Sequence, residues 1–440
     1  MLNLCSKQKI VMKNIVLKQR AERDDLASRP YYTRKHIQDI APFLESSVPK
    51  LITGPRRAGK SVYAMQILSD KNYAYLNFDD TLLLGAFDED SVMQALAEVY
   101  PGYEYLLLDE VQNLHSWDAW VAKLYRRGVN LVITGSNANL LSSEMATLLT
   151  GRYLEIQILP FSMEETLNYR GAPINAELPD ERARLALEMD DYLKKGGYPE
   201  IVKNREIEQA YLSAMFDSII LKDVAQRHKI RKITELYDLA DYLISNYSNP
   251  LSYNEIAKEL SLGSVTTVKK FCGYLAEPYL FFYLPRYDNK LKEMKKAPRK
   301  VYVIDNGFIY TRSFELSSNN GRQLENMVFI ELLRRGFDLK KSLFYYRTSN
   351  DKEVDFVTRD GRKVTSLIQV SYDISKTKTR ERELDALVKA SEELKCDNLL
   401  LITWDQNEEV NYKGKMISIL SVENGLTHNK NTFLGNSVQD

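Results

Sequence analysis

The sequence is short of the features that mark several special classes of protein. Its 440 residues include only three cysteines and four histidines, and 60 Lys and Arg balance 60 Asp and Glu. The cysteines, Cys5, Cys272 and Cys396, are far apart and form no zinc-binding pattern with the histidines. No apolar run approaches the roughly 20 residues that a membrane helix needs. We therefore expect neither a zinc site, nor a uniformly basic coat for nucleic acid, nor a membrane-spanning helix.

The N-terminus carries several lysines but has neither a long apolar stretch nor a small-residue cleavage site of the kind found in signal peptides. The sequence thus predicts a cytoplasmic protein with reduced thiols and no membrane partner. At about 150 residues per domain, its length suggests about three domains.

Short apolar runs alternate with helix-like stretches in the first third of the chain. Because such alternation is typical of a parallel sheet with helical crossovers, we expect an α/β fold here. The expected strands are Lys50–Thr53, Tyr73–Phe78, Tyr105–Leu108 and Leu131–Thr134, and the expected helices are Ser61–Ser69, Asp90–Val99 and Trp117–Arg127.

The rest of the chain reads as a helical connector and two further compact regions. A helix-rich region ends in an aromatic strand at Tyr279–Leu284, and a mixed helix and strand pattern follows it. The polar last residues are expected to be disordered. The predicted divisions are a helical segment 1–48, a P-loop domain 49–170, a helical connector 171–232, a winged-helix domain 233–312, a nuclease-like domain 313–426 and a tail 427–440.

A phosphate-binding motif follows the first expected strand. The segment Gly54–Ser61 reads GPRRAGKS, which fits GxxxxGK[ST] between a strand and a helix. Its glycines let backbone N–H groups surround phosphate oxygens, and the following helix adds its positive N-terminus. Lys60 is expected at the β and γ phosphates of ATP, and Ser61 on Mg²⁺. The expected nucleotide-binding residues are Gly54, Pro55, Arg56, Arg57, Ala58, Gly59, Lys60, Ser61 and Val62.

Two acidic residues follow a later apolar run. Asp109 and Glu110 come directly after Tyr105–Leu108, about 50 residues beyond the P-loop. We expect Asp109 to hold Mg²⁺ through water and Glu110 to polarise the attacking water. Because an acidic pair after an apolar run is common, this pair indicates a nucleotide site only in combination with the P-loop.

The next strand ends in polar residues that could sense the γ-phosphate. Ser136 and Asn137 follow this strand, and Arg152 follows a glycine somewhat later. Ser136 or Asn137 would lie near the nucleotide if the strands are neighbours, and Arg152 could neutralise charge in the transition state. The alternatives are a simple Gly-Ser-Asn turn and a solvated surface arginine.

Several motifs together resemble those of a known family. They are Gly54–Ser61, Leu108–Gln112, Thr134–Asn137, Gly151-Arg152 with Leu159–Phe161, Gly196–Pro199 and Glu353–Phe356. The chain resembles a family of bacterial and archaeal AAA-type ATP-binding proteins. In these proteins a P-loop domain precedes a C-terminal region of unknown function, made of a winged helix and a nuclease-like fold. The resemblance implies ATP binding and hydrolysis.

A helix-turn-helix is expected in the second half of the chain. The capping box Ser252–Glu255 starts one helix, and Val265, Val268, Cys272 and Leu275 share a face of the next. The stretch Arg286–Lys300 then carries seven basic residues against two acidic ones. Both features favour a phosphate partner such as DNA, although winged helices also dock proteins or cover ATPase sites.

The last region resembles the PD-(D/E)XK nuclease core. The resemblance implies Glu325 on the first helix, Asp355 on the second strand and Gln369 on the third. Metal-dependent cleavage needs acidic ligands and usually a lysine. Here Gln369 replaces an acid and Ser371 replaces the lysine, and nothing in the sequence brings Lys376 or Lys378 into the site. We therefore expect no cleavage.

Taken together, the sequence predicts an AAA-type ATPase that uses ATP and Mg²⁺. Its nucleotide cycle would modulate the binding of nucleic acid or of a protein partner by the C-terminal domains, and oligomerisation is left open. The alternatives are a slow nucleotide-gated switch or scaffold with little turnover, and an ATP-gated DNA nuclease.

Overall fold

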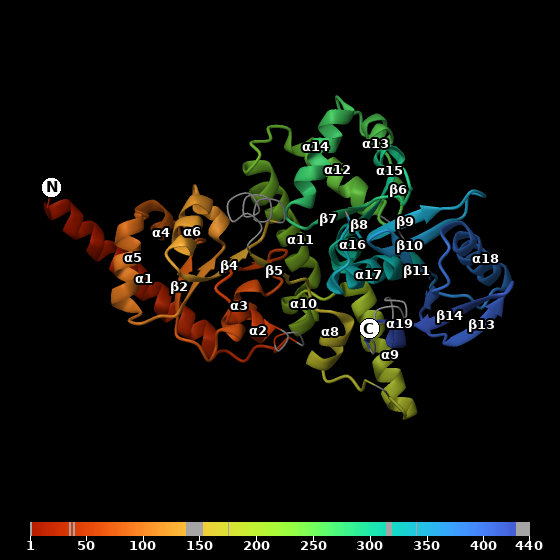
Figure 1. The fold of residues 1–440 in the computed structure, drawn as a ribbon, viewed down its shortest axis with the longest axis horizontal. Coiled ribbons are helices and arrows are strands. Elements are labelled where there is room, and N and C mark those ends of the chain that lie inside the picture. The colour runs from red at the N-terminus through yellow and green to blue at the C-terminus, as the bar shows by residue number, and fades with distance from the viewer. Residues whose placement is uncertain are drawn as a thin grey trace. The chain divides into compact units, whose positions relative to one another are not determined.

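The computed structural model divides the chain into two compact units (Figure 1). The first unit comprises Met1–Pro160 together with Glu277–Tyr279, and the second comprises Phe161–Ala276 and Leu280–Asp440. The structure describes residues 2–34, 37, 40–137, 153–174, 176–313, 319–339 and 341–427.

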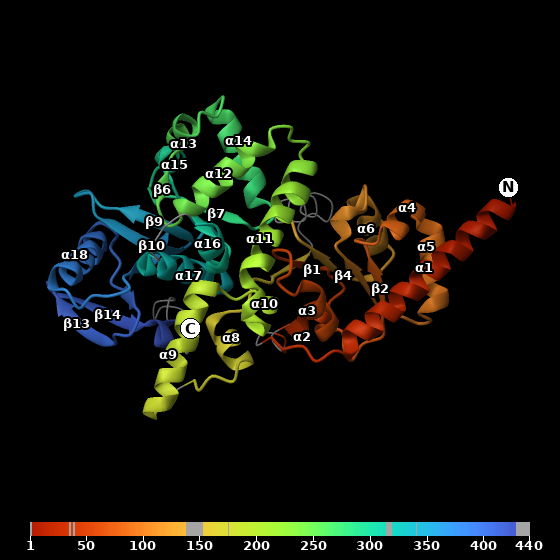
Figure 2. The same cartoon turned by 180° about the vertical axis from the view of Figure 1, so that it is seen from behind.

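The first unit is built on a five-stranded parallel sheet (Figure 2). Its strand order is β2-β3-β4-β1-β5, so β4 separates the strand before the P-loop from the strand before the acidic pair. The parallel α/β fold expected from the sequence is confirmed, and β5 is an addition to it. The strands are β1 (Lys50–Thr53), β2 (Tyr73–Asn77), β3 (Tyr105–Asp109), β4 (Asn130–Gly135) and β5 (Leu154–Gln157).

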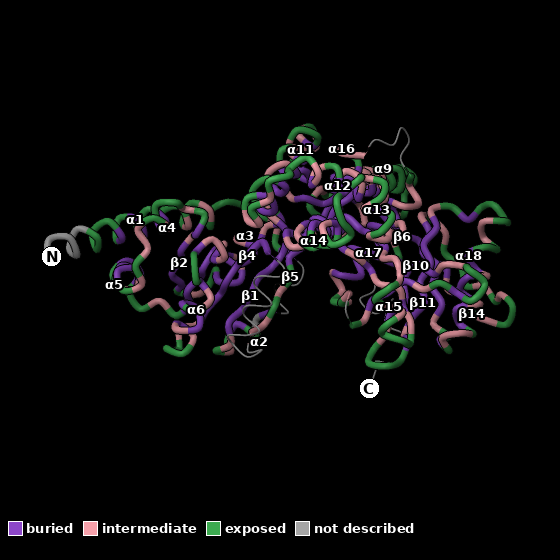
Figure 3. Tube along the Cα trace, turned by 90° about the horizontal axis from the view of Figure 1, so that it is seen from above, coloured by how far each residue is buried: buried purple, intermediate pink, exposed green. Residues whose placement is uncertain are grey.

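The central strands are apolar because they are buried on both faces. Every residue of β1 and β3 is buried, and the purple strands of the tube in Figure 3 show this interior. A parallel sheet covered by helices requires such continuous apolar runs. The helices are α2 (Ala41–Leu44), α3 (Lys60–Ile67), α4 (Thr81–Ala86), α5 (Glu89–Val99) and α6 (Trp117–Arg126).

A long N-terminal helix, α1 (Leu2–Ser28), packs against α5 and β2. Met12, Ile15 and Val16 are buried in the same core as the sheet. The Arg23 guanidinium donates to the Tyr73 carbonyl at 2.7 Å, so polar bonds as well as apolar contacts fix α1 to the edge strand.

The second unit begins with helices and continues into a small antiparallel sheet of order β6-β8-β7. Both helices of the expected helix-turn-helix are present. Val268, Cys272 and Leu275 are buried as expected, but Val265 is exposed because it is the first residue of its helix. The elements are α8 (Met163–Tyr169), α9 (Pro179–Lys195), α10 (Pro199–Lys203), α11 (Glu208–Ser218), a π-helix (Ile219–Gln226), α12 (Ile233–Ser245), β6 (Pro250–Leu251), α13 (Tyr253–Glu259), α14 (Val265–Ala276), β7 (Phe281–Leu284), α15 (Leu291–Lys296) and β8 (Arg299–Val303).

A six-stranded mixed sheet forms the rest of this unit. Its order is β13-β14-β12-β11-β10-β9, with β14, β12 and β11 parallel and the other pairs antiparallel. Helix α18 packs against the sheet, and β13 and β14 extend it beyond the strands expected from the sequence. The elements are α16 (Asn306–Arg312), α17 (Asn320–Arg334), β9 (Leu343–Arg347), β10 (Glu353–Asp360), β11 (Lys363–Val370), α18 (Thr377–Leu394), β12 (Leu399–Thr403), β13 (Glu408–Tyr412), β14 (Lys415–Ser421) and α19 (Val422–Thr427).

A buried carboxylate ties the glycine pair before α10 to the start of α16. Asp305 accepts hydrogen bonds from the backbone N–H of Gly197 at 2.8 Å and of Gly307 at 2.9 Å. A β-carbon on Gly197 would lie 2.1 Å from the carbonyl oxygen of Phe161. Only glycine fits this position without moving the backbone. Across the described ranges, no helix is both long enough and apolar enough to span a bilayer.

We expect Gly197→Ala to destabilise the protein by about 1–3 kcal/mol, because the added methyl group overpacks a buried backbone contact. Gly273→Ala is the matched control, since Gly273 is exposed within α14 and a β-carbon there meets nothing within 4 Å. This control should be neutral or stabilising by up to about 1 kcal/mol. Chemical denaturation of both variants measures the difference, and equal stabilities would contradict the packing argument.

Candidate functional site

The P-loop lies between β1 and α3, as its motif requires. Gly54 has a φ of 145°, and a β-carbon on it would lie 1.9 Å from the carbonyl oxygen of Ile158. Gly59 has a φ of 94° and is the N-cap residue of α3. Both glycines are thus demanded by backbone geometry. The loop keeps its amides close to the start of a helix, where an anion is stabilised.

The remaining motif residues differ in exposure. Pro55 and Ala58 are buried, whereas Arg57 is exposed and has a φ of 64°. Arg56 and Val62 are half-buried. Of the Arg56-Arg57 pair, Arg57 is therefore the residue that is more exposed to solvent.

A buried arginine outside the motif fixes the loop from behind. The Arg34 guanidinium donates to the carbonyl of Ala58 at 2.6 Å and to that of Leu159 at 2.9 Å. It joins the P-loop to the segment that follows β5. Nothing local in the sequence singles out Arg34, because its partners are 24 and 125 residues away.

Lys60 is buried next to the acidic pair. Its ammonium lies 3.2 Å from Glu110 Oε1 and donates to the Pro55 carbonyl at 3.1 Å. Ser61 Oγ donates to Asp109 Oδ1 at 2.8 Å. The structure thus brings together the lysine, the serine and both carboxylates that the sequence assigned to one site.

Asp109 is held by two side chains that the sequence did not single out. The hydroxyl of Tyr75, on β2, donates to Asp109 Oδ2 at 3.2 Å, and the hydroxyl of Thr134, on β4, donates to Oδ1. Burial, and then the charge of Glu110, raise the pKa of Asp109 to about 6. A buried carboxylate of this kind favours a nearby cation.

Glu110 is held in an unusual backbone conformation. Its φ is 51°, which is uncommon outside glycine and is found where function fixes the backbone. Gln112 Nε2 donates to Glu110 Oε2 at 2.5 Å and to Ser136 Oγ at 3.3 Å. Burial alone would raise the pKa of Glu110, but Lys60 and the hydrogen bonds from Gln112 and Ser136 lower it. Glu110 therefore stays ionised and oriented.

The residues after β4 lie at the same end of the sheet. Ser136 and Asn137 are buried, and β4 is the direct neighbour of β1, as the sensor hypothesis requires. Asn137 Nδ2 lies 3.4 Å from Glu277 Oε2, within the same unit. Arg152 lies outside the described residues, so its role stays a prediction.

These residues fit a nucleotide with Mg²⁺. Gly54 packs against the Ile158 carbonyl where no β-carbon fits, Gly59 lies at the N-terminus of α3, and the Lys60 ammonium reaches the loop at the Pro55 carbonyl. Ser61 and Asp109 offer the hydroxyl and carboxylate oxygens that Mg²⁺ prefers. The donor set is that of a P-loop NTPase.

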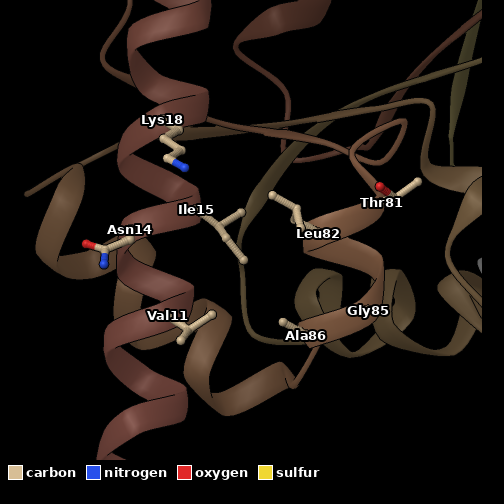
Figure 4. Close-up of a pocket in the computed structure, with 8 residues that line it drawn as sticks. All are labelled: Val11, Asn14, Ile15, Lys18, Thr81, Leu82, Gly85 and Ala86. Atoms are coloured by element: carbon tan, nitrogen blue, oxygen red, sulfur yellow. The ribbon is translucent and has the colours of Figure 1, made fainter.

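A hollow between α1 and α4 in the same unit has different chemistry (Figure 4). It encloses about 410 Å³, and its lining includes Val11, Ile15, Leu82 and Ala86. Lys18 is the one charged residue of this lining, which shares no residue with the P-loop. Its lining has no carboxylate to hold a metal ion or polarise water, unlike the site at the P-loop.

A second cluster of charged residues lies in the second unit, beside a cavity of about 460 Å³. The Lys300 ammonium is 2.8 Å from Glu353 Oε1, 2.8 Å from Asp355 Oδ1 and 2.9 Å from Glu325 Oε1. We call these four residues the Lys300 cluster. The sequence assigned Lys300 to an exposed basic patch, and this assignment is wrong because the side chain is 1% exposed.

Gln369 and Ser371, which the nuclease resemblance also singles out, line the same cavity. Gln369 Nε2 donates to Glu383 Oε2 at 2.7 Å, and Ser371 also lines the cavity. Lys376 and Lys378 are exposed and do not line it. The lysine that Glu325, Glu353 and Asp355 surround is Lys300, which comes from β8 and not from the third strand of the motif.

Comparisons with known proteins match three successive parts of the chain. Residues 46–167 match a family described as an AAA domain, residues 187–318 match a domain of unknown function (DUF8612), and residues 320–422 match another (DUF4143). The structure of the Walker-type ATPase PABY2304 of Pyrococcus abyssi is 14% identical, covers 65% of this chain and 99% of that chain, and has a TM-score of 0.42. The P-loop, the parallel sheet and the AAA match define an AAA-type P-loop NTPase domain.

Two relatives extend over most of the chain. The uncharacterized protein MJ1544 of Methanocaldococcus jannaschii is 36% identical over 84% of this chain and 85% of its own length. An uncharacterized protein of Haemophilus influenzae is 32% identical over 77% of this chain and 86% of its own length. The chain therefore belongs to the family of AAA-domain proteins that includes these two.

We expect Tyr75→Phe to weaken the Mg²⁺-dependent part of nucleotide binding by about 10–100-fold, because it removes a hydrogen bond that orients Asp109. Tyr105→Phe is the matched control, since its buried hydroxyl donates to the Leu44 carbonyl at 3.3 Å and not to the site. Calorimetric titration of nucleotide at several Mg²⁺ concentrations measures the effect. Equal Mg²⁺ dependence in both variants would show that Tyr75 does not support a metal ligand.

Proposed function

We propose that this protein hydrolyses ATP at its P-loop and that the cycle alters how its second unit binds a partner. The observation that carries the proposal is that Lys60, Ser61, Asp109 and Glu110 lie together, with Lys60 and Asp109 buried and the other two half-buried. A P-loop lysine, a hydroxyl, a metal-binding carboxylate and an ionised glutamate are the groups that phosphoryl transfer to water requires.

Each group has one task in this proposal. ATP would supply the phosphoanhydride bond that is cleaved. Mg²⁺ would supply the positive charge that offsets the negative phosphates. Lys60 binds phosphate oxygens in place of Glu110 Oε1, and this exchange frees Glu110 to accept a proton from water. Ser61 and Asp109 hold the metal, while Ser136 and Asn137 lie where a γ-phosphate would be sensed. Arg152 is proposed to act on the transition state, in its own subunit or in a neighbour.

The proposal for the second unit rests on element order and exposed charge. The order α12, β6, α13, α14, β7, α15, β8 supports the winged-helix proposal, and the segment between β7 and β8 carries most of the basic residues. Lys290, Lys292, Lys295 and Lys296 are all exposed there. Exposed lysines beside a helix-turn-helix favour DNA, and a protein partner is the alternative.

We expect Lys60→Ala to abolish ATP binding, because the lysine contacts phosphates in the ground state. Glu110→Gln, which keeps the size of the side chain, should retain binding and lose hydrolysis, since only water activation is removed. Equilibrium binding of labelled ATP and a phosphate-release assay measure the two steps.

The measurements of ATP binding and phosphate release also distinguish ATP hydrolysis from the alternative functions. Wild-type protein that binds ATP but releases little phosphate, with or without DNA, would favour a nucleotide-gated switch. Unchanged hydrolysis in Glu110→Gln would remove Glu110 from the catalytic role and contradict the proposed mechanism.

If DNA is the partner, its affinity should fall steeply with salt. Each phosphate contact contributes about 0.9 to the logarithmic salt slope, so replacing Lys292, Lys295 and Lys296 by alanine should flatten the slope by up to roughly three. The matched control replaces three exposed lysines elsewhere in this unit, Lys376, Lys378 and Lys395. Fluorescence anisotropy measures both, and a salt-insensitive interaction, or none, would favour protein docking.

A further inference from the structure

The Lys300 cluster places one ammonium among three carboxylates in a buried site. A lysine ammonium has three N–H donors and no acceptor. Here the three nearest acceptors are oxygens of Glu325, Glu353 and Asp355, all within 2.9 Å of Nζ. Every donor of the ammonium therefore has a carboxyl oxygen as its partner.

The carboxylates are fixed by further hydrogen bonds. The Tyr302 hydroxyl donates to Glu325 Oε1 at 2.7 Å, and the Val370 backbone N–H donates to Asp355 Oδ2 at 3.0 Å. Burial alone would lower the pKa of Lys300, but the surrounding anions outweigh it and hold that pKa well above its usual range. Lys300 therefore stays charged and cannot serve as a general base.

These residues do not fit the Mg²⁺ ion that the nuclease resemblance implies. Mg²⁺ requires oxygens at about 2.0–2.1 Å and Ca²⁺ at about 2.3–2.6 Å. The three oxygens surround a nitrogen at 2.8–2.9 Å instead, which is the length of a charged hydrogen bond. Within the described parts of the chain, no group of three or more acidic, histidine or cysteine side chains is placed to hold a metal ion.

We propose that the Lys300 ammonium is the built-in cation of this site and takes the place of a divalent metal. A metal ion could enter only if Lys300 left, and its departure would strand a buried positive charge away from its partners. The cavity is thus kept as a binding or structural feature without metal-dependent cleavage. This inference does not depend on hydrolysis at the P-loop.

The test is metal binding by the full-length protein without nucleotide. Lys300→Met removes the ammonium and leaves the carboxylates, so we expect it to bind Mn²⁺ with a Kd at least about 100-fold lower than that of the wild type. Free Mn²⁺ is measured by electron paramagnetic resonance. Added Mn²⁺ should also raise the Tm of this variant and not that of the wild type.

Two controls isolate the site. Lys352→Met removes a lysine that lines the same cavity but pairs with Asp385 at 2.9 Å, and it should behave as the wild type. Adding Asp355→Asn to Lys300→Met should abolish the acquired Mn²⁺ binding. Metal bound at the P-loop is common to all these variants and cancels in the comparison.

Three results would overturn the proposal. The first is wild-type Mn²⁺ binding that disappears in Asp355→Asn, a result that stands even if Lys300→Met fails to fold. The second is a folded Lys300→Met variant with no gain in Mn²⁺ affinity. The third is Mn²⁺-dependent DNA cutting by the wild type that is lost in Lys300→Met, which would make Lys300 a catalytic lysine beside a metal.

Discussion

The register of three parallel strands determines the nucleotide site. Leu108 pairs with Ile133, and Ile52 pairs with Thr134, so β3, β4 and β1 end at the same level of the sheet. Asp109 is the last residue of β3 and lies beside Thr134, while the P-loop leaves β1 at the same edge. A shift of one residue in either pairing would turn these side chains to the opposite face. The buried apolar strands therefore stabilise the fold and also set the distances in the site.

Two buried lysines show how the number of partners sets the chemistry of an ammonium. Lys60 has one carboxylate, Glu110, and one carbonyl oxygen as close partners. A polyanionic phosphate can replace such a partner at modest cost, because the freed Glu110 remains bonded to Gln112. Lys300 has three carboxylates, and no single ligand would compensate all of them. The Lys60 ammonium can thus exchange its carboxylate partner for a phosphate. The Lys300 ammonium is held in place by its three partners.

Much of the fold could be predicted because its signals are local. The P-loop, the acidic pair and the four strands expected in the first unit are contiguous patterns, and the structure contains all of them. The supporting residues gave no such signal. Tyr75 and Thr134 reach Asp109 across 34 and 25 residues, and Arg34 reaches Leu159 across 125. Contacts of that separation depend on strand order, which no short motif encodes.

Lys300 shows why a count of basic residues led to a wrong prediction for this side chain. Counted with its neighbours, it belongs to a stretch with seven basic residues, yet it directly precedes the apolar residues 301–303 of β8, which are all buried. That position puts it inside the unit, where an unpaired ammonium would be very costly. The site has no acid at Gln369 and no lysine at Ser371, but it keeps the buried carboxyl groups of Glu325 and Asp355 and the half-buried one of Glu353. Lys300, which comes from a strand outside the motif, is the cation that these carboxyl groups surround.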